Sequence, residues 1–250
     1  MNGTHMHKPA RKEKLGRLSN FQMPSILNRG YIIYLYHFAD LKKAFDLYIK
    51  DGNDVLDIGC GNKPYEEYIQ GLINPKEQTA RYTGCDIVQS SAQKVDIICE
   101  ATNIPEPSGT YDIVLCTQVI EHVFEHQKVF SEAYRLLKPG GYFIVSGPMV
   151  WSLHEEPYDF YRFTKYGFCE LLTGSGFSIV HEKMGGGQWA TFGQMFLHIT
   201  SISAKNKFLR KILHVFCKPT VLFSNLFFPW IDKKFNNANY TLNYLFVGKK

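Results

Sequence analysis

The chain has 250 residues, of which 45% are hydrophobic and 20% are charged. A chain of this length can bury the core of one α/β domain with an appendage, and it leaves little room for a second full domain. The formal net charge of +5 is too small to indicate nucleic-acid binding, so we expect no nucleic-acid partner.

The first 20 residues are predicted to be a disordered or tag-like lead, and residues 21–250 are predicted to form a single domain. No apolar segment of the kind found in secretory signals follows the N-terminal charges. The longest strongly apolar run without a charge, residues 219–231, is shorter than the ~20 residues that span a bilayer. The six cysteines include no C-x-x-C pair, which is typical of a reduced compartment. We therefore expect a cytoplasmic protein, with attachment to the inner face of the membrane as an alternative.

The first predicted element is an amphipathic helix that ends before Gly52. Its apolar side chains recur at spacings of three and four residues, at Tyr34, Phe38, Leu41, Phe45 and Tyr48. Such a stripe is typical of a helix that packs against a sheet. A position over a bound ligand is the alternative.

The stretch 54–64 predicts a strand, a tight turn and the start of a helix. Residues 55–58 are apolar apart from Asp57, as in a parallel strand that is covered on both faces. Gly59 and Gly61 allow the backbone to turn sharply and to approach a ligand closely. Pro64 suits the first turn of a helix. Together these residues predict a cradle for a nucleotide-like ligand.

Strands and helices then alternate along the chain. Further strands are predicted at 82–87, 95–100, 111–116, 142–146, 177–180 and 242–247, with helices at about 65–72, before Lys138, and from Thr164 to Gly174. This order predicts an α/β fold with a doubly wound parallel sheet. Such sheets bind ligands outside the carboxyl ends of their strands.

The segment before the last strand, about residues 185–239, is predicted to be a helical insertion that is apolar, aromatic and basic. Residues 201–250 contain nine Lys or Arg residues against a single acid, Asp232. Three roles fit this composition: a packed subdomain with a basic rim, a homodimer face, or a lid that closes over an acceptor at an anionic membrane surface.

Asp86 ends the second strand, 27 positions after Gly59. A carboxylate at this place can accept hydrogen bonds from both hydroxyls of a ribose. Asn62 and Lys63 stand where a dinucleotide-binding turn continues to its third glycine, and the negative charge of Asp57 opposes a phosphate. A ligand with an adenine, a ribose and a positively charged end therefore fits better than NAD.

Six motifs in this order resemble those of class I S-adenosylmethionine-dependent methyltransferases of the type 11 group, at 55–61, 86, 100–102, 111–114, 119–123 and 136–141. The resemblance covers roughly residues 55–180. It implies a seven-stranded Rossmann-like sheet whose last strand is antiparallel, with an N-terminal helix and the helical insertion added. It also implies S-adenosylmethionine as the cofactor. The cofactor-binding residues that it implies are Asp57, Gly59, Cys60, Gly61, Asn62, Asp86, Ile87, Glu100, Ala101, Thr102, Thr117, Gln118 and Val119.

The stretch 148–164 is similar to a run in methyltransferases of bacterial polysaccharide and lipopolysaccharide gene clusters. This similarity implies O-methylation of a sugar or other small hydroxylated acceptor, free or lipid-linked, in envelope glycan biosynthesis. A quinone-like or other small aromatic acceptor is one alternative, because aromatic residues make up 15% of the chain. A non-catalytic scaffold that binds the cofactor is another.

A hydroxyl acceptor must lose a proton to a nearby base. The candidate catalytic residues at the mouth of the predicted site are His154, His122 and Asp159, with Glu121 beside them. The candidates for holding the acceptor are Tyr158, Tyr161 and Arg162. A purely structural role is the alternative for each histidine and for the arginine.

Some members of the resembled family bind a divalent metal through Glu-x-x-Glu-His at this position. In this chain Gln118 replaces the first acid, which leaves Glu121 and His122 one ligand short. We therefore predict no metal site.

Overall fold

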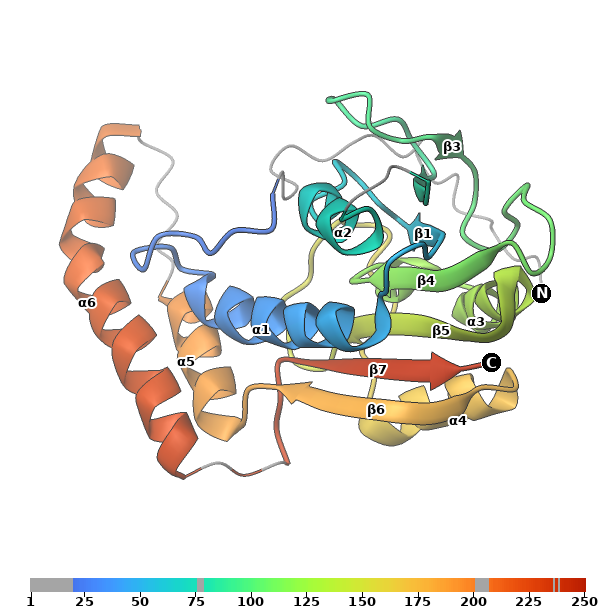
Figure 1. Ribbon diagram of the computed structural model, residues 1–250. Helices are drawn as coiled ribbons and strands as arrows, with labels where there is room; N and C mark the ends of the chain where they lie inside the picture. Colours follow the sequence, from blue (N-terminus) through green and yellow to red (C-terminus); the bar gives the residue numbers. More distant parts are fainter. Residues whose placement is uncertain (1–19, 76–78, 201–206, 236, 238) are drawn as a thin grey trace, which may run out of the picture.

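The computed structural model describes residues 20–75, 79–200, 207–235, 237 and 239–250, so the predicted lead lies outside the described residues except for Asn20. A seven-stranded sheet forms the centre, in the order β3-β2-β1-β4-β5-β7-β6 (Figure 1). The strands are β1 (Val55–Ile58), β2 (Tyr82–Asp86), β3 (Ile97–Ile98), β4 (Tyr111–Thr117), β5 (Leu137–Pro148), β6 (Ser178–Gly185) and β7 (Asn243–Lys249). β7 is antiparallel to both of its neighbours, β5 and β6, and the other strand pairs in the described residues are parallel. The predicted α/β sheet with an antiparallel last strand is confirmed.

Helices cover both faces of the sheet and one of its ends (Figure 1). They are α1 (Tyr31–Tyr48), α2 (Glu66–Ile73), the short 3-10 helix η1 (Ile120–His122), α3 (His126–Leu136), α4 (Lys165–Gly174), α5 (Gln188–Ile199) and α6 (Lys207–Lys234). None of the helices in the described part of the chain has both the length and the hydropathy needed to cross a bilayer.

The core lies in two layers because successive strand residues point to opposite faces. Leu56 and Val114 pack with α3 and α4, whereas their neighbours Val55 and Ile113 pack with α1 and α2. The apolar stripe of the first helix therefore contacts the sheet, as its spacing predicts. All four residues of β1 are buried, which is the pattern of a strand covered on both sides.

Three strands differ most from their predicted lengths. The strand predicted at 95–100 is reduced to β3, because the Asp96 carboxylate accepts the Gly84 N–H (2.6 Å) where a strand would offer a backbone carbonyl. The strand predicted at 177–180 continues to Gly185, because β7 pairs with it along its length. The strand predicted at 142–146 already begins at Leu137, which pairs with Tyr111 before a bulge.

The predicted insertion contains α5 and α6, which lie beyond the carboxyl ends of the parallel strands (Figure 1). The one acidic residue in the sequence of the insertion, Asp232, connects α6 to α5 through hydrogen bonds. Asp232 on α6 is buried, and its carboxylate accepts the backbone N–H groups of Gly187 (2.9 Å), Trp189 (3.1 Å) and Ala190 (3.1 Å). The N-terminus of α5, which lacks a side-chain cap of its own, is thus capped by a negative charge from another helix.

Polar contacts also fasten the insertion to the segment that enters α1. Asn225 on α6 donates to the carbonyl groups of Ile26 (2.6 Å) and Asn28 (2.9 Å). Gln194 on α5 donates to the Arg29 carbonyl at 2.9 Å. The insertion is therefore packed as part of the domain, and it holds the N-terminal end of α1 against the ligand-binding edge of the sheet.

Candidate functional site

The turn after β1 has the conformation that its glycines permit. Gly59 and Gly61 have φ angles of +73° and +52°, a region that side chains disfavour. A Cβ atom at Gly59 would lie 2.3 Å from Cγ2 of Val119, so the backbone and Val119 come too close for any side chain there. The turn is held by the Cys85 carbonyl, which accepts the N–H groups of Gly59 (2.8 Å) and Cys60 (3.0 Å).

Asp57 lies beneath this turn and is 2% exposed. Its Oδ2 accepts a hydrogen bond of 2.5 Å from the Tyr82 hydroxyl. Burial raises the pKa of Asp57 to about 7, against the opposing effects of the Tyr82 hydrogen bond and the Lys63 charge. A cationic group of a ligand beside Asp57 would favour the ionised carboxylate.

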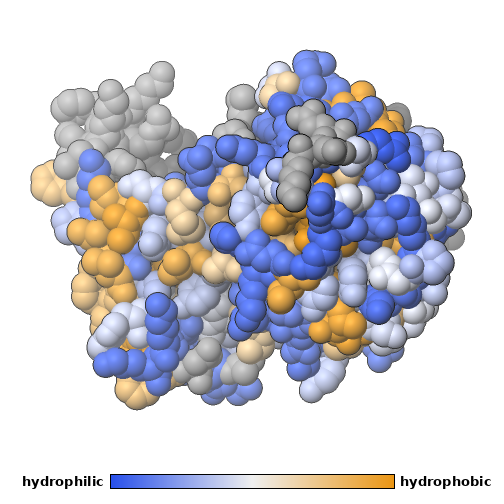
Figure 2. All heavy atoms as spheres, in the orientation of Figure 1, coloured by the Kyte–Doolittle hydropathy of each residue, from blue (hydrophilic) through white to orange (hydrophobic). Residues whose placement is uncertain are grey.

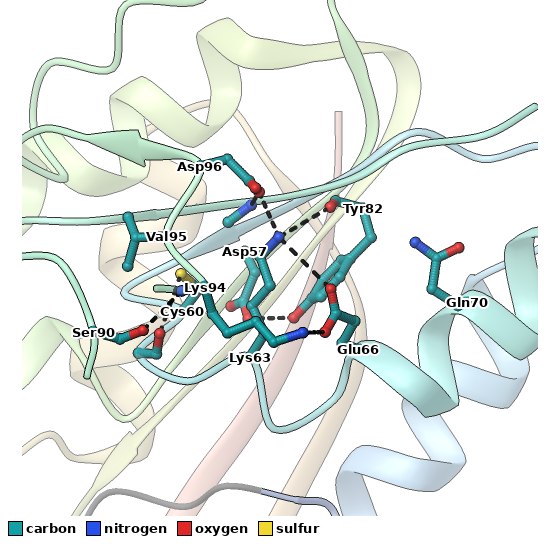
Figure 3. A network of polar contacts seen from close by, with 12 residues as sticks. Asp57, Cys60, Lys63, Glu66, Gln70, Tyr82, Ser90, Lys94, Val95 and Asp96 are labelled. Atoms are coloured by element: carbon teal, nitrogen blue, oxygen red, sulfur yellow. Dashed lines mark hydrogen bonds and ion pairs between the residues drawn. The ribbon is translucent and has the colours of Figure 1, made fainter. Parts of the chain in front are cut away.

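Lys63 anchors the turn from below (Figure 3). Its ammonium group lies 2.5 Å from Asp96 Oδ2 and 4.0 Å from Glu66 Oε1, although the side chain is only 5% exposed. A Cβ at Gly84 would lie 2.6 Å from both Cys60 Sγ and Lys63 Cε. The absence of a side chain at Gly84 therefore gives the Lys63 side chain the space it occupies. Lys63 therefore stabilises the turn through its ion pair with Asp96.

The carboxylate of Asp86 is oriented by two backbone groups at the end of β2. Its Oδ2 accepts the Gly61 N–H (3.1 Å) and its Oδ1 accepts the Ile87 N–H (2.7 Å). Nearby, Oδ1 of Asn62 is buried without a hydrogen-bond partner in the protein. A buried carbonyl oxygen of this kind requires a donor, which a ligand can supply.

Two adjoining cavities open at this edge of the sheet, with volumes of about 450 and 570 Å³. They share Gly59, Asp86, Val119 and His122 in their walls. The wall of the first cavity also includes Thr117, Gln118 and the turn residues Cys60, Gly61 and Asn62. The wall of the second includes Ile87, Glu100, Ala101 and Thr102. Every one of the predicted cofactor-binding residues thus lines one of the cavities, and their binding role stays a prediction.

Several wall residues were not predicted from the sequence. In the first cavity they are Ile33, Tyr34, His37, Tyr65, Pro148, Trp151, Glu155, Leu242 and Asn243. Tyr34 belongs to the helical stripe of α1, so the stripe both packs on the sheet and faces the cavity. Asn243 begins β7 and Leu242 directly precedes it, and no motif in the sequence marks them.

The two candidate histidines lie side by side in the first cavity. The ring centroids of His122 and His154 are 4.7 Å apart, with the rings near perpendicular. Nδ1 of His122 is 2.9 Å from the Tyr158 carbonyl. Nδ1 of His154 is 3.2 Å from the Ser152 carbonyl and 3.2 Å from Asp159 Oδ2.

Asp159 and Arg162 form a bidentate ion pair that supports this loop. Both carboxylate oxygens of Asp159 lie 2.7 Å from guanidinium nitrogens of Arg162. Despite the cost of burial, the Arg162 and His154 contacts lower the pKa of Asp159 to about 2. Arg162 also donates to the Tyr161 and Ser152 carbonyls. Tyr158 lines the second cavity, whereas Tyr161 and Arg162 lie in the wall of neither, so the structure favours the structural alternative for Arg162.

Glu121 is fully buried beside His122, and neither of its carboxylate oxygens has a hydrogen-bond partner in the protein. Burial raises its pKa to about 8. Glu121, His122 and His154 each offer a ligand atom, and these atoms lie within 4.8 Å of one another. The prediction of no metal site rested on a missing ligand at Gln118, and the fold brings a third ligand from a different loop.

Comparison with known proteins agrees with this geometry. Residues 56–145 match the family described as "Methyltransferase domain". A "probable S-adenosylmethionine-dependent methyltransferase" of Mycolicibacterium smegmatis is 36% identical over 142 residues, which cover 51% of this chain and 53% of that protein. A ubiquinone biosynthesis O-methyltransferase of Marinobacter nauticus is 32% identical over 112 residues, covering 38% of this chain and 44% of that protein. The chain thus spans about half the length of these relatives.

A solved structure shares the fold. The crystal structure of an S-adenosylmethionine-dependent methyltransferase from Archaeoglobus fulgidus superimposes with a TM-score of 0.53, at 17% identity, covering 89% of this chain and 95% of that one. At this identity the likeness concerns the fold alone. Residues 56–145 thus match a methyltransferase domain, and the fold around them is shared with a solved S-adenosylmethionine-dependent methyltransferase.

Proposed function

We propose that this chain transfers a methyl group from S-adenosylmethionine to a hydroxyl of a sugar or other small hydroxylated acceptor in the synthesis of envelope glycans. The observation that carries the proposal is the pair of adjoining cavities. One wall offers oriented carboxylates for a nucleoside with a cationic end, and the wall shared with the acceptor side offers two imidazoles.

The residues present fit the cofactor. S-adenosylmethionine, when bound, supplies an electrophilic methyl group on a sulfonium. Asp86 would hold the ribose hydroxyls, because Gly61 and Ile87 orient its carboxylate at the carboxyl end of β2, in the wall that both cavities share. Asp57 would face the ammonium group, and the unpartnered Asn62 Oδ1 would accept a hydrogen bond from it. Much of the rate enhancement in such a transfer comes from alignment of the two reactants.

The chain must also take the proton of the acceptor hydroxyl as the new C–O bond forms. His122, His154 and Val119 line the first cavity, and we place the contact between acceptor and cofactor beside them. Asp159 fixes the orientation of His154 by accepting its backbone N–H at 2.9 Å. The carboxylate of Asp159 acts through His154 and is itself occupied by Arg162, so we assign it a positioning role.

The first cavity extends from the histidines to Trp151, Tyr34 and Glu155. An aromatic ring can pack on the apolar face of a sugar, and polar groups can bind its hydroxyls. This mixture supports a glycan acceptor. A small aromatic acceptor is the second candidate, favoured by the Marinobacter relative whose name refers to ubiquinone, and by the apolar wall that Ile33 and Leu242 form.

Turnover with labelled S-adenosylmethionine on three acceptor groups separates the candidates. The panel contains sugar nucleotides, lipid-linked glycans and phenols of quinone precursors. We expect methylation of a glycan hydroxyl. Methylation of the phenols alone would replace the first candidate by the second. If the chain binds the cofactor but methylates none of the three acceptor groups, the result would favour the non-catalytic, cofactor-binding scaffold.

We also propose that α5 and α6 attach the protein to an anionic bilayer. Their exposed apolar side chains include Phe192, Met195, Ile199, Phe223, Leu226 and Trp230. Figure 2 shows hydrophobic surface gathered over α6. In the described residues of the insertion, Lys218, Lys233 and Lys234 are exposed while the only acid, Asp232, is buried, so the surface charge is positive.

Flotation with vesicles of anionic lipid tests this attachment. We expect salt-sensitive binding that is weakened by Trp230→Ser with Phe223→Ser. A loss of flotation together with a change of oligomeric state, measured by light scattering, would assign the same face to a homodimer. Absence of salt-sensitive flotation in the unaltered protein would contradict the proposal.

A further inference from the structure

We propose that His37 and Asn243 form a subsite of the first cavity in which the His37 ring donates a hydrogen bond to an uncharged oxygen of the acceptor, apart from the oxygen that is methylated. This inference rests on the proposed methyl transfer and narrows its acceptor. His37 lies on α1 and Asn243 begins β7, so only the fold brings them together. Both residues are buried, and both line the cavity.

The contact between the two side chains decides which ring nitrogen of His37 carries the proton. Nδ2 of Asn243 lies 2.9 Å from Nδ1 of His37. An amide nitrogen can only donate, so Nδ1 accepts and the proton of the neutral ring is on Nε2. Burial lowers the pKa of His37 to about 4, which keeps the ring neutral at physiological pH. His37 is therefore a neutral donor at Nε2.

A glycine on the neighbouring strand gives the Asn243 amide its place. Gly185 at the end of β6 pairs with Asn243 in the sheet. A Cβ atom at Gly185 would lie 1.9 Å from Oδ1 of Asn243, so no side chain fits there. The amide is thus enclosed against the sheet and presents its nitrogen to His37.

Nε2 of His37 is open to a ligand. Among the described residues, Asn243 is the hydrogen-bond partner of the ring, through Nδ1. Nε2 is not one of the polar atoms that the protein buries without a partner, and the residue lines the cavity. Ile33, one helical turn before His37, and Leu242, directly before Asn243, line the same cavity and have no side-chain acceptor. The donor at Nε2 therefore requires an oxygen from water or from a ligand that displaces it.

The order of the strands places this subsite on the acceptor side. Between β1, which carries Asp57, and β7, which begins with Asn243, lie β4 and β5. With about 4.8 Å between neighbouring strands, Asn243 is on the order of 14 Å from β1 along the sheet, and Asp86 on β2 is one strand further away. It is also about 10 Å from β4, whose last residue, Thr117, lines the cavity. The oxygen bound by His37 is thus distinct from the methylated one.

The charges in the wall indicate what kind of oxygen enters. The described wall residues of the first cavity include Asp57, Asp86 and Glu155 but no lysine or arginine. A carboxylate or phosphate of the acceptor would lose its hydration there without gaining a cation. A hydroxyl, a ring oxygen or a carbonyl oxygen has no such cost. The part of the acceptor inside the cavity is therefore uncharged, as a neutral sugar ring is.

NMR of the full chain labelled with nitrogen-15 histidine tests the proton position without any turnover. We expect His37 in the neutral Nε2–H form, unchanged between about pH 6 and pH 8. His37→Leu identifies its signals by their loss. In Asn243→Asp the new carboxylate can only accept, so Nδ1 becomes protonated. An Nδ1–H form or an imidazolium in the unaltered chain would overturn the proposal, and the unaltered chain decides alone if Asn243→Asp does not fold.

The same NMR signals test the kind of ligand. Neutral methyl glycosides are added to the labelled chain, with glucuronate as the charged comparison. We expect the neutral sugars to shift the His37 signals and glucuronate to leave them in place. His181 on β6, outside the walls of both cavities, is the internal control and should not respond. No shift of His37 with the neutral sugars, or an equal shift with glucuronate, would contradict the proposal.

Kinetics and calorimetry separate a role toward the acceptor from a role toward the cofactor. His37→Leu should raise the KM of the acceptor found in the turnover panel about tenfold, the effect of one lost hydrogen bond. It should leave the affinity for S-adenosylmethionine unchanged, and His181→Leu should change neither quantity. An unchanged KM, or a tenfold loss of cofactor affinity, in His37→Leu would refute the assignment. If the unaltered chain does not bind S-adenosylmethionine, the proposed function fails while the two NMR results still stand.

Discussion

The hydroxyl of Tyr82 donates to Asp57 Oδ2 at 2.5 Å, directly beneath the glycine turn. Tyr82 begins β2 and Asp57 lies within β1, so adjacent strands hold the acid in place. The carboxylate stays buried, and its pKa rises to about 7. A group that titrates near neutrality at the cofactor cavity gives binding a measurable dependence on pH.

We expect the affinity for S-adenosylmethionine to increase about tenfold between pH 6 and pH 8. The pKa of Asp57 is raised from 3.8 to about 7, so the carboxyl is mostly protonated at pH 6 and mostly ionised at pH 8. A cationic ligand favours the ionised form, and its binding therefore strengthens as the pH rises. Calorimetry at several pH values measures this. Asp57→Asn should bind weakly at every pH, and an unchanged pH profile in that variant would refute the assignment.

Gly59→Ala is expected to destabilise the fold and to weaken cofactor binding. The new Cβ would meet Val119 at 2.3 Å, which adds an overpacking cost of about 1–3 kcal/mol to the strain of a positive φ. Gly52→Ala is the matched control, since Gly52 has φ +77° and no atom within 4 Å of the built Cβ. The difference between the two variants in urea unfolding isolates the contact with Val119. Equal losses in both would contradict it.

Asp232→Ala should lower the free energy of unfolding by on the order of 2–5 kcal/mol, because it leaves the buried N–H groups at the start of α5 without an acceptor. The Tyr36 hydroxyl loses its partner as well. Lys233→Ala, at the next position and exposed, is the control and should change little. If the two variants unfold at the same urea concentration, the capping role is wrong.

Arg162→Lys should reduce kcat on the order of tenfold while leaving cofactor affinity unchanged. Lysine cannot reproduce the bidentate pairing with Asp159, so the support of His154 loosens. Arg135 forms a comparable pair with Glu132 on α3, away from the cavities, and Arg135→Lys controls for the loss of a bidentate pair as such. Equal kcat values for the two variants would argue against a positioning role of Arg162.

Much of the cofactor side could be predicted from the sequence, because it depends on local features. The strand, the glycine turn and Asp86 follow from an apolar run, two glycines and the end of the next strand. Their side chains come together through the general geometry of a parallel sheet. The role of Lys63 could not be predicted in this way, since its partner Asp96 lies 33 residues further along.

The acceptor side depends on contacts that no local pattern records. His154 reaches Glu121 and His122 only through the path of the loop after β5, so the sequence suggested a metal ligand was missing. Asp232 was noticed as a lone acid in a basic segment, yet its role requires knowing that α6 crosses the start of α5. The strand at 95–100 was overestimated, because the side chain of Asp96 replaces a backbone acceptor.

Calorimetric binding of S-adenosylmethionine to the unaltered chain, to Asp86→Ala and to Asp112→Ala tests the central claim most directly. Asp112 is a carboxylate paired with Lys138 away from both cavities, and it serves as the control. We predict binding to the unaltered chain and to Asp112→Ala, with a loss of about 1–3 kcal/mol in Asp86→Ala through lost charged hydrogen bonds. No binding to the unaltered chain, or equal affinity in all three proteins, would contradict the account.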